Sequence, residues 1–267
     1  MSEEAEGDLP VYDRGIPIRA ISRGIAVLQA INRGNSLSLT EIARSSEMPY
    51  PTACRIVQTL VYEGLIEREP ARKRYRPTAM VQTLAHGFQG DAHLVKVARP
   101  HIVDLTRRLG WPISLTTNVG HSMIIRDSTH ALTTLTFNDY HPGFTIPVLE
   151  CAAGLGYIGH VPEERRRDML TGLKLLPKRV NLHMIALFEE GGLAEEIRRD
   201  GYATRGHNRF TRNPGKTSSI AVPIGRGRNV AGMLTLAWFA VAMKMGDAVE
   251  RFVQPLRDTA AAIEGDL

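Results

Sequence analysis

Residues 38–60 read SLTEIARSSEMPYPTACRIVQTL, and this stretch decides the fold of the N-terminal part of the chain. Ser38 followed by Glu41 three positions later is a capping box, which predicts that a helix starts here. Met48-Pro49 should end this short helix, and Pro51 suits the first position of the next one. Two helices joined by so short a turn are typical of a helix-turn-helix.

The sequence on either side of this stretch completes a winged helix-turn-helix over residues 19–77. Apolar residues recur at helical spacing from Arg19 to Gly34, which predicts a first helix that packs against the other two. After Gly64, residues 65–68 and 74–76 read as short strands around the turn 70–73, a hairpin that would form the wing.

Positive charge is densest in this segment. Residues 19–76 hold ten Lys and Arg against five Asp and Glu, a net charge of +5, whereas the whole chain of 267 residues carries +5. Residues 1–18 have five acidic residues and one basic residue, and we expect them to form a disordered acidic tail. A local excess of positive charge favours a polyanionic partner, and here we expect double-stranded operator DNA.

The second helix of a helix-turn-helix presents its N-terminal residues to the major groove. With Ala53, Val57 and Leu60 facing the core, Arg55 would face the groove, where it could bind guanine through two hydrogen bonds. Basic side chains of the wing would contact the DNA backbone or the minor groove. We expect the DNA-binding residues to be Arg23, Tyr50, Pro51, Thr52, Arg55, Gln58, Thr59, Arg72, Lys73, Arg74 and Arg76.

The rest of the chain alternates between strand and helix patterns. Residues 78–90 read as a linker helix, and residues 91–267 as an effector-binding domain that opens with a helix over 92–109. Strands are expected at 113–119, 123–127, 132–137, 218–224 and 230–239, and helical segments at 154–161, 163–170, 182–200 and 247–263. Grouped strands flanked by helices predict an α+β domain around a largely antiparallel sheet.

Signals for other classes of protein are weak. Gly154 to Gly159 match G-x-G-x-x-G, but no acidic residue follows about twenty positions later, so close packing of a glycine-rich helix against the sheet explains them better. The most apolar segment, residues 234–243, is too short to span a membrane. We expect a cytoplasmic protein that is not an enzyme, with no catalytic residues, no cofactor and no metal. An enzyme, or an interaction protein that uses the helix-turn-helix for docking, remains the alternative.

The chain resembles the IclR family of bacterial transcription regulators over about residues 19–263. The N-terminal likeness is carried by residues 22–24, 39–43, 51–55, 58–60 and 63–65, and the C-terminal likeness by residues 151–156, 200–202, 218–224 and 230–232. Within the family, it is most similar to activators of 3-(3-hydroxyphenyl)propionate catabolism, on the strength of residues 111–112, 126–130, 219–223 and 242–243.

The resemblance implies a linker helix that dimerises, a GAF-like effector domain, and dimers or dimers of dimers on palindromic operators. The ligand residues of the family fall on Gly154, Leu155, Ser219, Thr235 and Ala237, and its pocket aspartate falls near Asn208, where this chain has an insertion over 209–216. Apolar residues at 237–239 suggest a less polar pocket than one for glyoxylate, and the resemblance implies an aromatic carboxylic acid as effector. It would bind between the amides of Gly154 and Leu155 and the late strands, with Arg126 as a partner for its carboxylate.

Overall fold

The computed structural model divides the chain into two compact units, Met1–Gly87 and Phe88–Leu267, each with its own hydrophobic core. It describes residues 18–34, 36–84, 92–135, 140–176, 180–206, 216–225 and 230–267. Nearly all of the expected acidic tail (1–18), the second half of the expected linker helix (78–90) and Asn208 lie outside the described residues.

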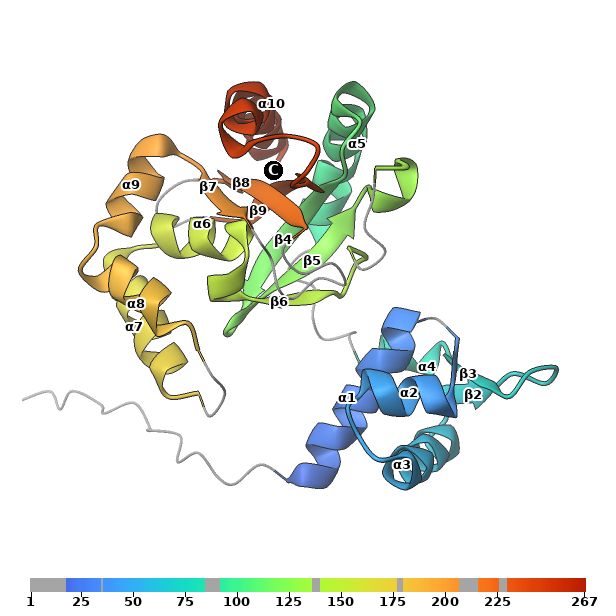
Figure 1. The fold of residues 1–267 in the computed structure, drawn as a ribbon. Helices are drawn as coiled ribbons and strands as arrows, with labels where there is room; N and C mark the ends of the chain where they lie inside the picture. The colour runs from blue at the N-terminus through green and yellow to red at the C-terminus, as the bar shows by residue number, and fades with distance from the viewer. Residues whose placement is uncertain are drawn as a thin grey trace, which may run out of the picture. The chain divides into compact units, whose positions relative to one another are not determined.

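The first unit has the helices and the hairpin of a winged helix-turn-helix (Figure 1). Its elements in chain order are α1 (Arg19–Gly34), β1 (Leu37–Ser38), α2 (Leu39–Ser45), α3 (Tyr50–Tyr62), β2 (Ile66–Arg68), β3 (Arg74–Pro77) and α4 (Met80–Thr83).

The capping box at the start of α2 is confirmed. The backbone N–H of Ser38 donates to Glu41 Oε2 at 2.8 Å, and the N–H of Glu41 donates back to Ser38 Oγ at 3.3 Å. The turn between α2 and α3 places Glu47 in the left-handed region with φ 52°, a conformation that a residue with a Cβ adopts at a cost. This turn lets both helices bury their apolar faces in one core, in which Ile42 and Val57 are at most 1% exposed.

The wing is a three-stranded antiparallel sheet in the order β1-β3-β2. The hairpin of β2 and β3 was predicted, and Glu67 stands directly opposite Arg76 in it. Strand β1 was not predicted, because it has only two residues and the second, Ser38, is also the N-cap of α2.

The second unit is built on an antiparallel sheet in the order β6-β5-β4-β9-β8-β7. Its elements are α5 (Ala92–Leu109), β4 (Ile113–Val119), β5 (Ser122–Ser128), η1 (His130–Leu132), β6 (Thr145–Pro147), η2 (Val148–Glu150), α6 (Ala152–His160), α7 (Glu163–Lys174), α8 (Leu182–Glu189), α9 (Leu193–Asp200), β7 (Ala203–Gly206), β8 (Thr217–Ile224), β9 (Gly232–Phe239) and α10 (Met245–Asp266).

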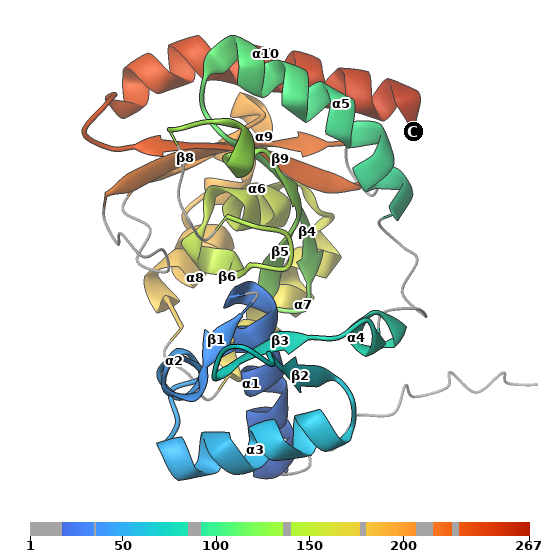
Figure 2. The same cartoon turned by 90° about the vertical axis from the view of Figure 1, so that its right-hand side faces the viewer.

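Helices cover both faces of this sheet. Helices α5 and α10 lie side by side on one face, and α6 lies on the opposite face (Figure 2). The core between the sheet and helices α5 and α10 buries Trp238, Phe252 and Leu256 completely. The core between the sheet and α6 buries Met233 and Ile158. A sheet apolar on both faces explains why β8 and β9 read as nearly continuous apolar runs.

Two expectations for this unit were wrong in detail, and two strands were not predicted. Residues 132–135 form no strand: Leu132 ends a 3-10 turn, and Thr133 Oγ1 donates to the carbonyl of Gly110 at 2.6 Å. The edge strand next to β5 is β6 instead. The helical segment 182–200 is two helices, because Gly192 adopts a left-handed φ of 70° between them, and strand β7 was not predicted.

In the described part of the chain, every helix is either too short or too polar to cross a bilayer.

Candidate DNA-binding surface and effector cavity

Helix α3 separates a buried face from an exposed one, as its pattern predicted. Ala53, Val57 and Leu60 are at most 8% exposed and hold the helix against α1 and α2. The opposite face joins the first turns of α1 to form a hollow of about 720 Å³. Predicted DNA-binding residues line most of it, and the full lining is Ala20, Arg23, Pro51, Thr52, Arg55, Ile56, Gln58, Thr59 and Tyr62.

The side chains on this face differ in how freely they can reach a partner. Thr59 Oγ1 donates to the carbonyl of Arg55 at 3.1 Å, so its proton is used within the helix and its oxygen is left to accept. Tyr50 is 50% exposed at the start of α3 but does not line the hollow. Arg55 is exposed, with a side chain long enough to reach a base edge.

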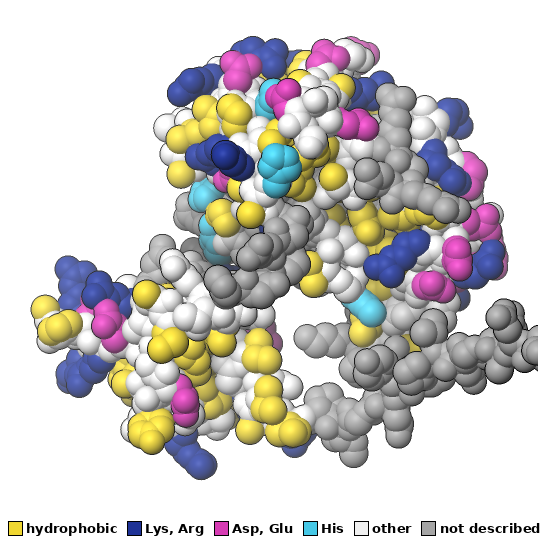
Figure 3. Space-filling model, turned by 180° about the vertical axis from the view of Figure 1, so that it is seen from behind, with side chains coloured by type: hydrophobic (Ala, Val, Ile, Leu, Met, Phe, Trp, Pro, Cys, Tyr) yellow, Lys and Arg dark blue, Asp and Glu magenta, His cyan; other side chains and the backbone are white. Residues whose placement is uncertain are grey.

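The four basic wing residues fall into two pairs. Arg72 and Lys73 are exposed in the turn between the strands, and Figure 3 shows Lys and Arg side chains around the end of this unit that carries the hairpin. Arg76 lies beside Glu67 on the opposite strand, with Nη2 and Oε1 2.6 Å apart. Arg74 is held most closely: it donates to the carbonyl of Ser36 at 2.7 Å and lies 2.9 Å from Glu41 Oε2.

Arg74 is therefore held within the fold, Arg76 is paired across the hairpin but remains exposed, and Arg72 and Lys73 extend from the turn. Sequence reasoning could not separate these pairs, because the partners of Arg74 lie more than thirty positions earlier in the chain.

In the second unit a small cavity of about 20 Å³ lies between the sheet and the start of α6. Ser219 and Thr235, two of the expected effector residues, line it. Thr235 Oγ1 is buried without a hydrogen-bond partner among the described residues, so it is available to a ligand. The sequence did not single out the other lining residues, which are Ser114, Thr116, Met123, Ile125, Tyr140, Ile146, Cys151 and Ala153.

The amides expected to hold a carboxylate are already engaged. The N–H of Gly154 points to Cys151 Sγ at 3.3 Å, and the N–H of Leu155 donates to the carbonyl of Cys151 at 3.0 Å. A Cβ at Gly154 would lie 1.9 Å from the carbonyl oxygen of Val148, so this position admits no side chain. Close packing of the glycine-rich helix is confirmed, and at Gly156 the neighbour is Met233 of β9.

Among the described residues, two further expected effector residues, Arg126 and Ala237, do not line the cavity. Arg126 Nε donates to Thr117 Oγ1 at 2.8 Å, whereas the neighbouring residue Ile125 points into the cavity. Thr117 follows the cavity-lining residue Thr116 and so points to the opposite face of the sheet, where Arg126 lies beside it. Ala237 is 3% exposed and belongs to the apolar core on the α6 side.

The thiol of Cys151 faces the cavity at the start of α6. Burial raises its pKa to about 12, against the opposing effect of the Gly154 N–H that points at the sulfur. The side chain is therefore a neutral thiol at physiological pH and acts as a small apolar wall with weak polarity.

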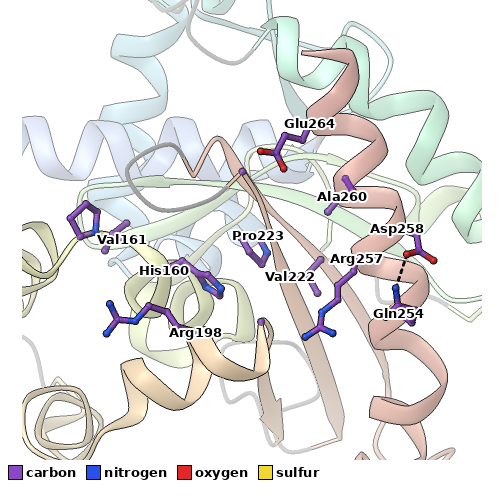
Figure 4. Close-up of a pocket in the computed structure, with 14 residues that line it drawn as sticks. His160, Val161, Arg198, Val222, Pro223, Gln254, Arg257, Asp258, Ala260 and Glu264 are labelled. Atoms are coloured by element: carbon purple, nitrogen blue, oxygen red, sulfur yellow. Dashed lines mark hydrogen bonds between the residues drawn. The ribbon is translucent and has the colours of Figure 1, made fainter.

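A larger and more open cleft of about 810 Å³ lies between α6, α9, β8 and α10 (Figure 4). Its charged residues have opposite signs, with Arg198 and Arg257 against Asp258 and Glu264. Arg257 is also engaged with the carbonyl of Asp200 and lies over the ring of Tyr202. Burial lowers the pKa of His160 at its edge, which favours the neutral imidazole.

Comparison with known proteins gives a family for this arrangement. The family model of the IclR helix-turn-helix domain matches residues 20–70. Over 229 residues the chain is 30% identical to the HTH-type transcriptional regulator BhcR of Paracoccus denitrificans, and the match covers 82% of this chain and 76% of BhcR. Over 159 residues it is 24% identical to the regulator TsaQ1/TsaQ2 of Comamonas testosteroni, covering 59% of this chain and 57% of that protein.

Solved structures share the fold. An IclR homologue from Microbacterium hydrocarbonoxydans, complexed with 4-hydroxybenzoate, has a TM-score of 0.64 and 24% identity, and the match covers 93% of this chain and 98% of that one. The predicted combination of a winged helix-turn-helix and an antiparallel-sheet α+β domain is thus confirmed. The chain belongs to the IclR family of transcriptional regulators.

Proposed function

We propose that this protein regulates an aromatic-acid catabolic operon, by binding operator DNA through α3 and an aromatic carboxylic acid in the cavity beside α6. The observation that carries the proposal is the exposed face of α3. Arg55, Gln58 and Thr59 are exposed there, while the residues behind them are almost fully buried. The helix is therefore held rigidly with its polar face available to a groove.

Recognition of base edges and attraction to the backbone come from different residues. Arg55 discriminates between bases, since its guanidinium matches the two acceptors of guanine. Lys73 and Arg72 at the wing turn contact phosphates, which adds affinity for any sequence. Arg23 joins the hollow from α1 and adds a further cation at its edge.

Apolar residues on the surface of the first unit favour a dimer. Ile21 and Ile25 of α1, and Ile18 just before it, are 52–65% exposed, and Leu84 is 65% exposed just after α4. Two copies associated through such residues would present two α3 helices to the half-sites of a palindrome.

The cavity suits an aromatic acid better than a small polar one. Its walls combine Tyr140, Ile125 and Met123 with a few hydroxyl groups, and the Microbacterium homologue of the same fold is complexed with 4-hydroxybenzoate. About 20 Å³ holds roughly one water molecule, whereas small-molecule sites enclose about 300 Å³ or more. Binding therefore requires a second, wider conformation, which is the property a ligand-responsive regulator needs.

The test begins with selection of a binding duplex from a random pool by the full-length protein. Arg55→Ala should weaken binding to the selected duplex by about 5- to 150-fold, and leave binding to a scrambled duplex nearly unchanged, since a two-bond contact to guanine contributes roughly 1–3 kcal/mol of discrimination. Equal losses on both duplexes, or no salt-sensitive binding by the wild type, would contradict the proposal.

The effector half has a separate test. A thermal-shift series of aromatic acids should raise the melting temperature of the second unit, because a ligand that binds only the folded state stabilises it. Tryptophan fluorescence follows this unit alone, since both Trp111 and Trp238 belong to it.

A further inference from the structure

The expected donors for an effector carboxylate are all engaged elsewhere, yet a partly buried guanidinium, that of Arg205, lies near the cavity, with its side chain 22% exposed. Arg205 of β7 stands directly opposite Ser219 of β8. Directly opposed residues of an antiparallel pair point to the same face of the sheet, and Ser219 lines the cavity. Arg205 therefore lies on the cavity side of the sheet.

Of the two nitrogens along one edge of this guanidinium, only one has a hydrogen-bond acceptor among the described residues. Nη2 of Arg205 lies 3.0 Å from Oε2 of Glu150, a residue that is 5% exposed. Nε of Arg205 is buried with no hydrogen-bond partner among the described residues. A buried charged donor without an acceptor is unfavourable, and an incoming carboxylate oxygen would satisfy it.

The ion pair of Arg205 and Glu150 is also connected to the wall of the cavity through the backbone. Glu150 directly precedes Cys151, which lines the cavity and caps α6. The positive charge of Arg205 acts on the Cys151 thiol, where it opposes the rise in pKa caused by burial. A ligand in the cavity would feel the same charge.

We propose that Arg205 is the carboxylate-binding residue of the effector cavity, and that Glu150 is the internal carboxylate that occupies its guanidinium until an effector arrives. This inference rests on the proposed function. The Nε and Nη2 groups along one edge of an arginine donate two parallel hydrogen bonds to the two oxygens of a carboxylate. An effector would take the unoccupied Nε and compete with Glu150 for Nη2.

This exchange also accounts for the small size of the cavity. Glu150 belongs to the segment that leads into α6, and Arg205 belongs to the edge strand β7, so their ion pair ties two walls together. When an effector replaces Glu150, these walls are free to separate and the cavity widens.

Competition with the effector and a purely structural ion pair predict different results when each partner is changed in turn. If Glu150 competes with the effector, Glu150→Gln should tighten binding of an acid, whereas Arg205→Gln should weaken it. If the pair only holds the fold together, both changes should act in the same direction. The sign of the Glu150→Gln effect therefore decides between the two roles.

The experiment is calorimetric titration of the full-length protein with 3-(3-hydroxyphenyl)propionate, with 4-hydroxybenzoate, and with the neutral primary amide of each. Arg205→Gln should weaken binding of the acids by about 10- to 100-fold and leave binding of the amides within about twofold. Glu150→Gln should tighten binding of the acids. Arg199→Gln removes the same charge from an exposed position on α9 and should change nothing.

A double variant, Glu150→Gln with Arg205→Gln, guards against misfolding because it replaces the buried ion pair by two neutral amides. It should bind the selected duplex normally and fail to prefer acids over amides. Acid binding by Arg205→Gln within twofold of wild type, or weaker acid binding by Glu150→Gln, would overturn the inference and leave the proposed function intact. No binding of either acid to the wild type would overturn both the inference and the effector class.

Discussion

Two neighbouring residues of the wing, Lys73 and Arg74, should give opposite results when each is changed to alanine. Both changes remove one positive charge from the same end of the same hairpin. Lys73 is exposed in the turn, whereas Arg74 donates to Ser36 and pairs with Glu41. We expect Lys73→Ala to affect DNA affinity and Arg74→Ala to affect the stability of the winged unit.

The contacts set the magnitude of the Arg74→Ala effect. The ion pair with Glu41 joins side chains that are 33% and 34% exposed, so solvent screening limits it to about 0.2–1 kcal/mol. The hydrogen bond to the carbonyl of Ser36, at 2.7 Å, adds about 1 kcal/mol. The sum is about 1–2 kcal/mol of unfolding free energy, which lowers the melting temperature of a domain this small by about 5–15 °C.

Lys73→Ala should leave the unfolding free energy within about 0.5 kcal/mol of wild type. Its effect appears instead in the salt dependence of DNA binding. Each phosphate contact that is lost should reduce the slope of log affinity against log salt by about 0.9, and binding to selected and scrambled duplexes should weaken alike.

Hydrogen exchange of the α3 amides reports opening of the winged unit alone, and anisotropy titrations at several salt concentrations give the slope. Tryptophan fluorescence from the second unit should be unchanged in both variants. If Arg74→Ala left α3 exchange unchanged and reduced the salt slope as much as Lys73→Ala, the division of the wing residues would be wrong.

Three further predictions concern single positions. Glu47→Gly should stabilise the winged unit by about 1 kcal/mol, seen as slower exchange of α3, because glycine adopts its φ of 52° without strain; faster exchange would argue against this. At pH 8 an alkylating reagent should label Cys54 but not Cys151 in the native protein, since a pKa of about 12 leaves Cys151 without thiolate, and mass spectrometry of the labelled peptides checks this. Gly154→Ala should destabilise the second unit by about 3 kcal/mol or more, because its Cβ would overlap the carbonyl of Val148; an unchanged tryptophan melting curve would refute the overlap.

The strongest local patterns gave the correct elements. The capping box at Ser38, the proline at the start of α3 and the glycine after it depend on a few adjacent residues, and all three act as predicted. The predictions that failed needed distant partners. The alternation over 132–137 resembles a strand, but Leu132 and Leu135 are 51% and 40% exposed, because the edge beside β5 is taken by β6.

By itself, the sequence determined that this protein carries a winged helix-turn-helix with Arg55 on its exposed face, because helix periodicity and capping are local properties of the chain. Only the tertiary structure decided what the charged side chains do. Arg74 is bound by the start of α2, Arg126 points away from the cavity, and Arg205 is brought to Glu150 from fifty-five positions away. The sequence specifies the type and charge of each residue. Whether a charged side chain faces solvent, a ligand or a buried partner depends on contacts between segments far apart in the chain.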